Sequence, residues 1–302
     1  MEERNWEDLD ADCLANVLGR VGLDSLLFDI PFVCKSWYKF TLNPFCWDTI
    51  VFPSNYNDGD VQKRFMKEYR VKKFSLDAFV KFIVDRSLGK CTALYLHHLY
   101  FVKEETINYV VDKCPSLRRL SLPRCQSGDG GFNAELIRKL KHLEELTLRD
   151  SANLIDITRE ININCTNFTL LAISHGGACI KEEEASAIVN NLPKIKYLKL
   201  SKGFIEQKSL VMILKGCKNL VHLDVSNCLG FNPDDKILAL ASHIGEFNYK
   251  GSVSDANLSA DYWAFSNEWK DGVRQRQRQR ERQVTPFIHS SRRRNSSSNL
   301  LD

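Results

Sequence analysis

The sequence predicts an α/β protein in which a small N-terminal bundle of three helices precedes a solenoid with a curved parallel sheet. Three observations lead to this prediction. A short apolar phrase recurs six times between residues 93 and 228, apolar residues at helical spacing follow most of its copies, and residues 1–52 lack the phrase. A strand and a helix that alternate at a fixed period cannot bury their apolar faces alone, so successive copies must stack.

The bundle is predicted in residues 1–52. The first helix has apolar residues at helical spacing: Leu14, Val17, Leu18 and Val21. Asp10 or Asp12 is placed to cap this helix, and Gly22 to end it. A second helix is expected from Asp24 and a third from about Pro31, since proline suits a first helical turn. So small a bundle buries little surface, and we expect a partner to cover part of it.

Residues 53–90 are predicted to form a linker and an irregular entry repeat. Turn-forming residues open the segment, and Phe74-Ser75-Leu76 then looks like a degenerate copy of the phrase. Further apolar residues follow it: Phe79, Phe82, Ile83 and Leu88. Terminal repeats are usually atypical because one of their faces has no neighbour. We expect this stretch to set the geometry between the bundle and the solenoid.

Residues 91–250 hold the regular repeats. Residues 114–125 and 217–228 both read C-x-x-L-x-x-L-x-L-x-x-C. The residues that open the L-x-L core follow one another at intervals of 26, 26, 25, 27 and 25: Leu94, Leu120, Leu146, Leu171, Leu198 and Leu223. Apolar alternation over a few residues predicts a strand. A strand–helix unit of this period is a leucine-rich repeat, and the period excludes ankyrin and tetratricopeptide arrays.

Helices are predicted downstream of five of these strands. The apolar stripes that predict them lie within residues 107–114, 136–140, 185–192, 210–214 and 237–244. Residues 244–249 are interpreted as a final, degenerate strand. Side chains alternate along a strand, so the residues between the leucines should line the concave face of the sheet. The candidate target-binding residues there are Arg119, Glu145, Arg149, Tyr197, Lys199, His222 and Asp224. Any solvated sheet face would read in a similar way, which is the alternative interpretation.

The ten cysteines include no C-x-x-C pair, and five of them recur at fixed phases of the repeat, before the strand (Cys114, Cys165 and Cys217) or after it (Cys125 and Cys228). We interpret them as small buried hydrophobic residues in a reducing compartment rather than as a metal site, and we expect no cofactor. The N-terminus does not resemble a signal peptide, and no stretch approaches the roughly 18 apolar residues that a membrane span needs. The expected location is the nucleus, the cytoplasm or both.

Two terminal segments complete the chain. Residues 251–270 are predicted to cap the open end of the core with four aromatic side chains: Tyr262, Trp263, Phe265 and Trp269. Residues 271–302 are predicted to be a disordered basic tail, whose local charge of +5 leaves the rest of the chain near −1. The tail could be a nuclear-import signal, a loose nucleic-acid contact or a solubilising end. Alternating Arg-Gln lacks aromatics for base stacking, so nucleic-acid binding is the less favoured of these functions.

The N-terminal residues also resemble a known family. The pattern consists of Trp6, Leu9, Leu14, Val17, Leu18, the Val33-Cys34-Lys35-Ser36-Trp37 run, Pro44 and Trp47. It is similar to an F-box, although Asp10 stands where that motif usually has proline. Together with the repeats, the chain up to about residue 250 resembles the plant F-box/leucine-rich-repeat proteins with cysteine-containing repeats.

This resemblance implies a function without enzymatic activity. It implies the substrate-recognition subunit of an SCF-type cullin-RING E3 ubiquitin ligase, in which the F-box docks on a Skp-type adaptor and, through it, joins the cullin and RING subunits. The repeats would present a protein target of unknown identity. Carried over by position, the adaptor-binding residues are Leu9, Leu14, Leu18, Val33, Cys34 and Trp37. The alternative is that these side chains fill the core of the bundle.

Two other functions remain open. The first is a leucine-rich-repeat binding module that acts outside a ubiquitin ligase, which the substitution at Asp10 motivates. The second is an enzyme with a nucleophilic site built from His97, His98, Cys91 and Asp112. No nucleophile elbow, phosphate loop or metal-ligand spacing accompanies these residues, so the enzyme is the weakest hypothesis.

Overall fold

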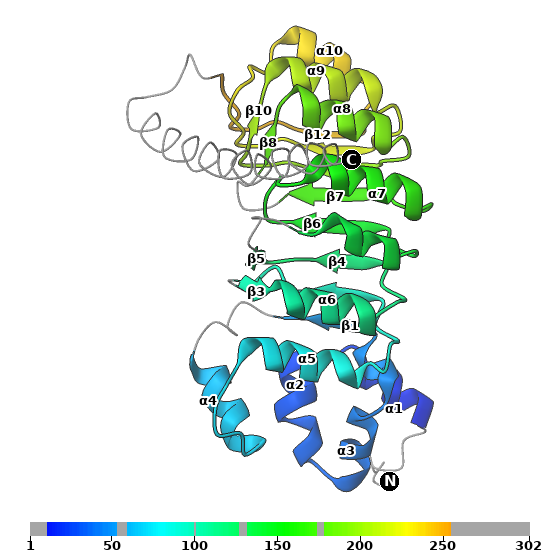
Figure 1. Cartoon of the computed structure of the whole chain (residues 1–302), viewed down its shortest axis with the longest axis vertical. Helices are drawn as coiled ribbons and strands as arrows, with labels where there is room; N and C mark the ends of the chain where they lie inside the picture. The colour runs from blue at the N-terminus through cyan, green and yellow to red at the C-terminus, as the bar shows by residue number, and fades with distance from the viewer. Residues whose placement is uncertain (1–10, 53–58, 100, 127–131, 174–177, 255–302) are drawn as a thin grey trace, which may run out of the picture.

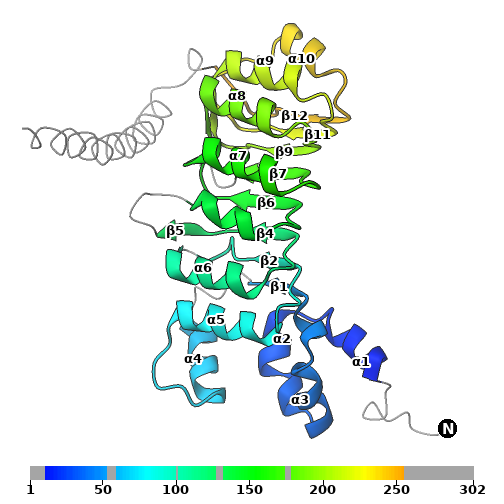
Figure 2. The same cartoon turned by 45° about the vertical axis from the view of Figure 1, so that its right-hand side comes forward.

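The computed structural model describes residues 11–52, 59–99, 101–126, 132–173 and 178–254. It confirms the predicted α/β class: a helical bundle lies at one end of an elongated molecule, and a parallel sheet runs along the long axis with helices stacked on one side (Figures 1 and 2). The predicted cap from residue 255 onward, with its four aromatic residues, and the basic tail lie outside the described residues, as do Trp6, Leu9 and Asp10.

The sheet has eight parallel strands in the order β1-β2-β4-β6-β7-β9-β11-β12. Their bounds are β1 Thr49–Val51, β2 Ala93–Tyr95, β4 Arg119–Ser121, β6 Glu145–Leu148, β7 Leu170–Ile173, β9 Tyr197–Lys199, β11 His222–Asp224 and β12 Glu246–Asn248. The register aligns one apolar row across the sheet: Ile50, Leu94, Leu120, Leu146, Leu171, Leu198, Leu223 and Phe247. The predicted strand phase and the degenerate final strand are therefore confirmed.

The first repeat departs from the predicted arrangement. Residues 74–76 form no strand; instead the Ser75 hydroxyl accepts a hydrogen bond from the Ala78 amide at 3.4 Å and caps α5 (Leu76–Arg86). The strand that belongs with this helix is β1, which pairs with β2 from within the N-terminal segment. An insertion that contains α4 (Gly59–Glu68) separates β1 from α5.

The helices along the array are α6 (Glu104–Lys113), η5 (Ala134–Lys139), α7 (Leu154–Asn164), α8 (Glu182–Asn191), α9 (Gln207–Gly216) and α10 (Asp235–Ala241). Two of them differ from expectation, because η5 is a 3-10 helix and α7 was not predicted. Helix α7 buries Leu154, Ile157 and Ile161 and begins after Asn153, whose φ of 59° lies in the left-handed region. Asparagine tolerates that conformation better than most residues do.

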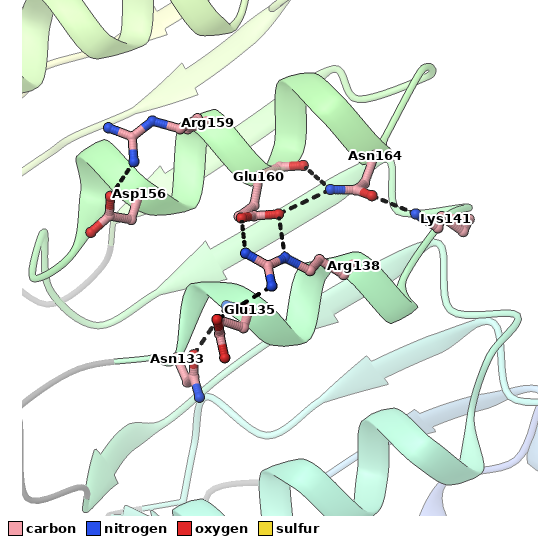
Figure 3. Close-up of polar contacts among 8 residues, drawn as sticks. All are labelled: Asn133, Glu135, Arg138, Lys141, Asp156, Arg159, Glu160 and Asn164. Atoms are coloured by element: carbon pink, nitrogen blue, oxygen red, sulfur yellow. Dashed lines mark hydrogen bonds and ion pairs between the residues drawn. The ribbon is translucent and has the colours of Figure 1, made fainter.

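A network of polar side-chain contacts joins η5 to α7 on the helical side of the array (Figure 3). Arg138 makes a bidentate contact with Glu160, with Nε–Oε2 and Nη2–Oε1 distances of 3.0 and 2.7 Å. Asn164 donates to the Glu160 backbone oxygen at 2.9 Å and to its carboxylate at 3.1 Å, and Lys141 donates to Asn164. The hydrogen bond from Arg138 holds the pKa of Glu160 below its usual range. These contacts link the helices of two successive repeats.

Short second strands follow the main sheet along one corner. They are β3 (Phe101–Lys103) with β5 (Arg124–Gln126), and β8 (Cys179–Ile180) with β10 (Phe204–Ile205). Between the two pairs, the Ser151 hydroxyl donates to the Cys179 carbonyl at 3.2 Å and accepts from its amide at 3.0 Å. At this position a side chain therefore makes the backbone hydrogen bonds that a short strand makes in the other repeats.

The repeat-phased cysteines Cys114, Cys165, Cys217 and Cys228 are buried, as predicted for small hydrophobic residues. The Cys228 thiol donates to the Leu200 carbonyl of the preceding repeat at 3.1 Å.

The bundle consists of α1 (Ala11–Leu18), α2 (Leu23–Phe28), the 3-10 turns η2 (Ile30–Phe32) and η3 (Pro44–Trp47), and α3 (Lys35–Thr41). The third predicted helix is thus wrong at its start: Pro31 lies in a separate 3-10 turn, and the α-helix begins at Lys35. One continuous apolar core runs from Leu14 in the bundle to Ile244 in the last repeat.

Candidate functional site

The predicted docking residues fall into two groups. Leu14 and Leu18 are each 2% exposed, so they belong to the core of the bundle. This corrects the prediction that they form part of the docking surface. Val33 is 59% exposed, whereas Cys34 and Trp37 are half-buried. The physical reason is helical periodicity, because α1 turns both leucines of the 14/18 pair inward, where it packs on α3 and η3.

Cys34 and Trp37 together define the start of α3. The Cys34 sulfur caps the helix by accepting a hydrogen bond from the Trp37 amide at 3.4 Å. The Trp37 ring packs against the core, and its indole Nε1 is buried without a hydrogen-bond partner among the described residues. A buried donor without an acceptor costs about 1–3 kcal/mol. Because the Trp37 ring packs against the core, replacing it would perturb the fold of the bundle as well as any interface.

Sequence reasoning missed most of the apolar surface of the bundle. Six large apolar side chains are exposed between 46 and 69% there, and we call them the apolar face: Val17, Phe32, Val33, Tyr38, Leu42 and Phe45. Their elements are packed together, since α3 contacts η2, η3 and α1. No helical spacing in the sequence could have indicated this face, because Leu42 follows the end of α3 and Phe45 lies in η3. Clustered exposed apolar residues mark interaction surfaces.

A buried tryptophan joins the bundle to the repeats. Trp47 is fully buried, and its Nε1 donates to the Thr41 carbonyl at 2.7 Å. The Arg86 guanidinium, from helix α5 of the first repeat, lies 5.4 Å from the centre of the Trp47 ring and 4.7 Å from that of Phe82. The end of the bundle is thus built into the first repeat.

Helix α4 and the residue that follows it, Tyr69, make further contacts with the bundle near this junction. Arg64 donates to Asp29 at 2.6 Å and to the Phe28 carbonyl at 3.1 Å. The hydrogen bond from Arg64 lowers the pKa of Asp29 below its usual value. Tyr69 donates to the Leu27 carbonyl at 2.9 Å. The bundle and the array are therefore held in one orientation.

The candidate target-binding residues lie on neighbouring strands of the concave face, as the register requires. Arg119 is aligned with Glu145, Tyr197 with His222, and Lys199 with Asp224. Tyr197 and Lys199 are exposed, whereas the other five residues of the set are half-buried. His222 Nδ1 lies 2.5 Å from a Glu246 carboxylate oxygen, so His222 is already paired within the sheet.

Arg149 is set apart from the other target-binding candidates. It donates to the His97 carbonyl at 3.5 Å, so it reaches from β6 across to the end of β2. It also lines a small cavity, whose other walls are Leu122, Pro123, Phe132, Leu148, Asp150 and Ala152. The sequence did not indicate this cavity, because its walls come from two successive repeats: Leu122, Pro123 and Phe132 follow β4, and the others end or follow β6.

The residues of the enzyme hypothesis are not assembled into a site. Cys91 is fully buried, and its contact with Cys114 together with burial raises its pKa far above the usual range for a thiol. Asp112 lies on α6, where it pairs with Lys139 at 2.6 Å. Nothing in the described part of the chain groups three or more His, Cys, Asp or Glu side chains in a way that could hold a metal ion. Among the described helices, none has the length and apolar character to cross a membrane.

Comparisons with known proteins show which proteins this chain is similar to. No family model matches the chain. The chain is 29% identical to the F-box protein SKIP19 of Arabidopsis thaliana over 232 residues, which cover 76% of this chain and 72% of that protein. It is 27% identical to an F-box/LRR-repeat protein of the same plant over 243 residues, 78% of this chain and 77% of the relative.

Among solved structures, an internalin (inlF) from Listeria monocytogenes matches with a TM-score of 0.32 and 13% identity, over 60% of this chain and 65% of that one. This TM-score is too low to support any conclusion about the fold. The sequence relatives confirm the resemblance drawn from the motifs: the chain is similar to F-box and F-box/LRR-repeat proteins of Arabidopsis thaliana.

Proposed function

We propose that this chain is the substrate-recognition subunit of an SCF-type cullin-RING ubiquitin ligase. In this role the bundle docks on a Skp-type adaptor, which connects it to the cullin and RING subunits, and the concave face of the repeats holds a protein target. The chain itself carries no chemistry in this proposal. The observation that carries it is the apolar face, which leaves six large apolar side chains of an F-box-like bundle open to a partner.

The junction supports the same proposal. A receptor must hold its target at a defined position relative to the ligase, and a flexible tether would not do so. Here Trp47, Arg86 and the bonds of Arg64 to α2 fix the bundle to the first repeat, and β1 continues directly into the sheet. Every strand of the concave face is thereby oriented with respect to the apolar face.

The test uses two exposed valines as a matched pair. Val33 is 59% exposed in the apolar face, and Val221 is 48% exposed on the array. Neither fills the core, so an aspartate at either position should leave the fold intact. We expect Val33→Asp to reduce the amount of Skp-type adaptor that co-purifies by about tenfold, because a carboxylate would be desolvated in the interface. Val221→Asp should bind the adaptor as wild type does.

Thermal melts of both variants confirm that they remain folded. Equal adaptor binding by wild type and Val33→Asp would refute docking through the apolar face. A wild-type chain that binds no Skp-type adaptor would refute the ligase role and favour a binding module that acts outside a ubiquitin ligase.

A further inference from the structure

The end of helix α4 and the turn after it carry a compact group of positive charges. Lys67, Arg70, Lys72 and Lys73, which we call the basic corner, are all exposed. Their neighbours Lys63 and Arg64 are paired with Asp60 and Asp29. The four residues of the basic corner make no ion pair within the described part of the chain.

The basic corner is held rigidly against the bundle. Arg64 and Tyr69, on either side of Lys67, both bond to backbone carbonyls at the end of α2. The Tyr69 ring stacks on Phe65 with ring centres 4.7 Å apart, and Phe65 is buried. Arg70 has a φ of 53°, which turns the chain sharply after the helix. The four cations are therefore presented from a fixed frame rather than from a loose tether.

The basic corner also lies at the same end of the molecule as the apolar face. Helix α4 packs against α2, and both views place its C-terminal end beside α2 at the end of the molecule where α3 lies (Figures 1 and 2). Helix α3 adds two exposed cations, Lys35 and Lys39, on the element that carries Tyr38 of the apolar face and is followed directly by Leu42. A partner seated on the apolar face would meet a positively charged border.

The chemistry of this border favours an acidic protein segment over a nucleic acid. Val71 is 38% exposed between Arg70 and Lys72, so the corner offers an apolar contact among its charges. Its aromatic neighbours Tyr69 and Phe74 are half-buried and packed on the core, so they are not free to stack on bases. The cations are gathered in one turn rather than spread along a stripe that could follow a phosphate backbone.

We propose that the basic corner binds an acidic segment of the protein that docks on the apolar face. The proposal rests on the function proposed above, with the Skp-type adaptor as the partner. Uncompensated charges at the rim of an interface act mainly on the rate of association, because they attract the partner before the apolar surfaces meet. The basic corner would thus speed and orient docking, while the apolar face holds the complex.

The test compares two charge reversals in the full-length protein. One variant carries Lys67→Glu, Arg70→Glu, Lys72→Glu and Lys73→Glu. The matched control reverses four exposed lysines of the distal repeats, which changes the net charge equally: Lys215, Lys218, Lys236 and Lys250. Association and dissociation rates with the adaptor are measured by surface plasmon resonance at about 0.05 M and about 0.3 M salt. Salt screens the electrostatic attraction but not the apolar contact, so the two contributions can be separated.

We expect the corner variant to associate about tenfold more slowly at low salt, with an unchanged dissociation rate, and the difference to shrink at high salt. The distal control should stay within about twofold of wild type. Equal slowing by both variants, or none in the corner variant, overturns the proposal.

A second arm keeps this test separate from that of the proposed function. A decaglutamate peptide and a single-stranded oligonucleotide are titrated against the same three proteins. Selective loss of peptide binding in the corner variant supports the inference even if wild type binds no adaptor, in which case the ligase role alone fails. Selective loss of oligonucleotide binding, with no effect on the peptide, overturns it in favour of a nucleic-acid contact.

Discussion

Trp47 allows the coupling between the bundle and the repeats to be tested quantitatively. The residue is fully buried, and truncation of such a side chain to alanine typically costs about 3–5 kcal/mol through lost contacts and the cavity left behind. Trp47→Ala also removes the 2.7 Å hydrogen bond to the Thr41 carbonyl and the ring beneath Arg86. These losses fall on both sides of the junction.

The expected effect is large enough to measure in a thermal melt. For a domain of this size, each 1 kcal/mol shifts the melting temperature by about 2–4 °C, so Trp47→Ala should lower it by roughly 6–20 °C. Trp47→Phe keeps an aromatic ring and loses the indole N–H, and it should fall between alanine and wild type. Phe45→Ala is the matched control, because Phe45 lies two residues away in the same 3-10 turn but is 69% exposed.

Phe45→Ala should melt within about 1–2 °C of wild type, since exposed substitutions usually change stability by less than about 0.5 kcal/mol. The reasoning is refuted if Trp47→Ala melts as wild type does. It is also refuted if Phe45→Ala destabilises the chain equally, because burial would then not be the cause.

Further predictions concern the array. Leu146→Asp should abolish soluble expression because it buries an unpaired carboxylate in the central strand, whereas Thr147→Asp should be tolerated on the solvated face; equal solubility would contradict the strand phase. Burial raises the pKa of Cys228 from 9.0 to about 12, so its contribution to stability is complete below pH 9.0 and is lost as pH rises towards 12. Melting temperatures at rising alkaline pH should therefore fall less steeply for Cys228→Ala than for wild type. Gly203→Ala would place a Cβ 2.6 Å from atoms of the preceding repeat, whereas Gly245→Ala meets nothing closer than 3.4 Å, so a melt of the first variant should show the larger loss.

The repetition of the sequence explains why most of the array could be predicted. A leucine such as Leu120 recurs at a nearly constant interval, and the same environment is imposed on every copy by the copies beside it. Helix α7 escaped prediction although Leu154, Ile157 and Ile161 have helical spacing, because Asp150 to Asn153 reads as a turn and polar residues interrupt the stripe. The sequence also did not show that η5 is a 3-10 helix, because six residues are too few for their apolar spacing to distinguish a 3-10 helix from an α-helix.

The candidate site could be predicted only in part. The motif placed Val33, Cys34 and Trp37 in one helix, whereas in the structure only Trp37 lies in α3, Cys34 caps it and Val33 ends the preceding 3-10 turn. Exposure depends on how the helices pack, which spacing along a single helix does not reveal. Leu14 and Leu18 therefore proved to be buried, whereas Phe32 and Phe45, which the motif does not include, proved to be exposed.

The position of β1 leads to a last prediction about dividing the chain. The sheet begins at Thr49, before the predicted end of the F-box segment at residue 52. A fragment of residues 53–302 would lose β1 and leave β2 as an unpaired edge, and exposed edges pair with other chains. We expect this fragment to elute as oligomers in size-exclusion chromatography, while a fragment of residues 43–302, which keeps η3 and β1, contains a larger monomer fraction. A monomeric 53–302 fragment with unchanged melting behaviour would show that the array does not need the strand, because the core would then close without Ile50 beside Leu94.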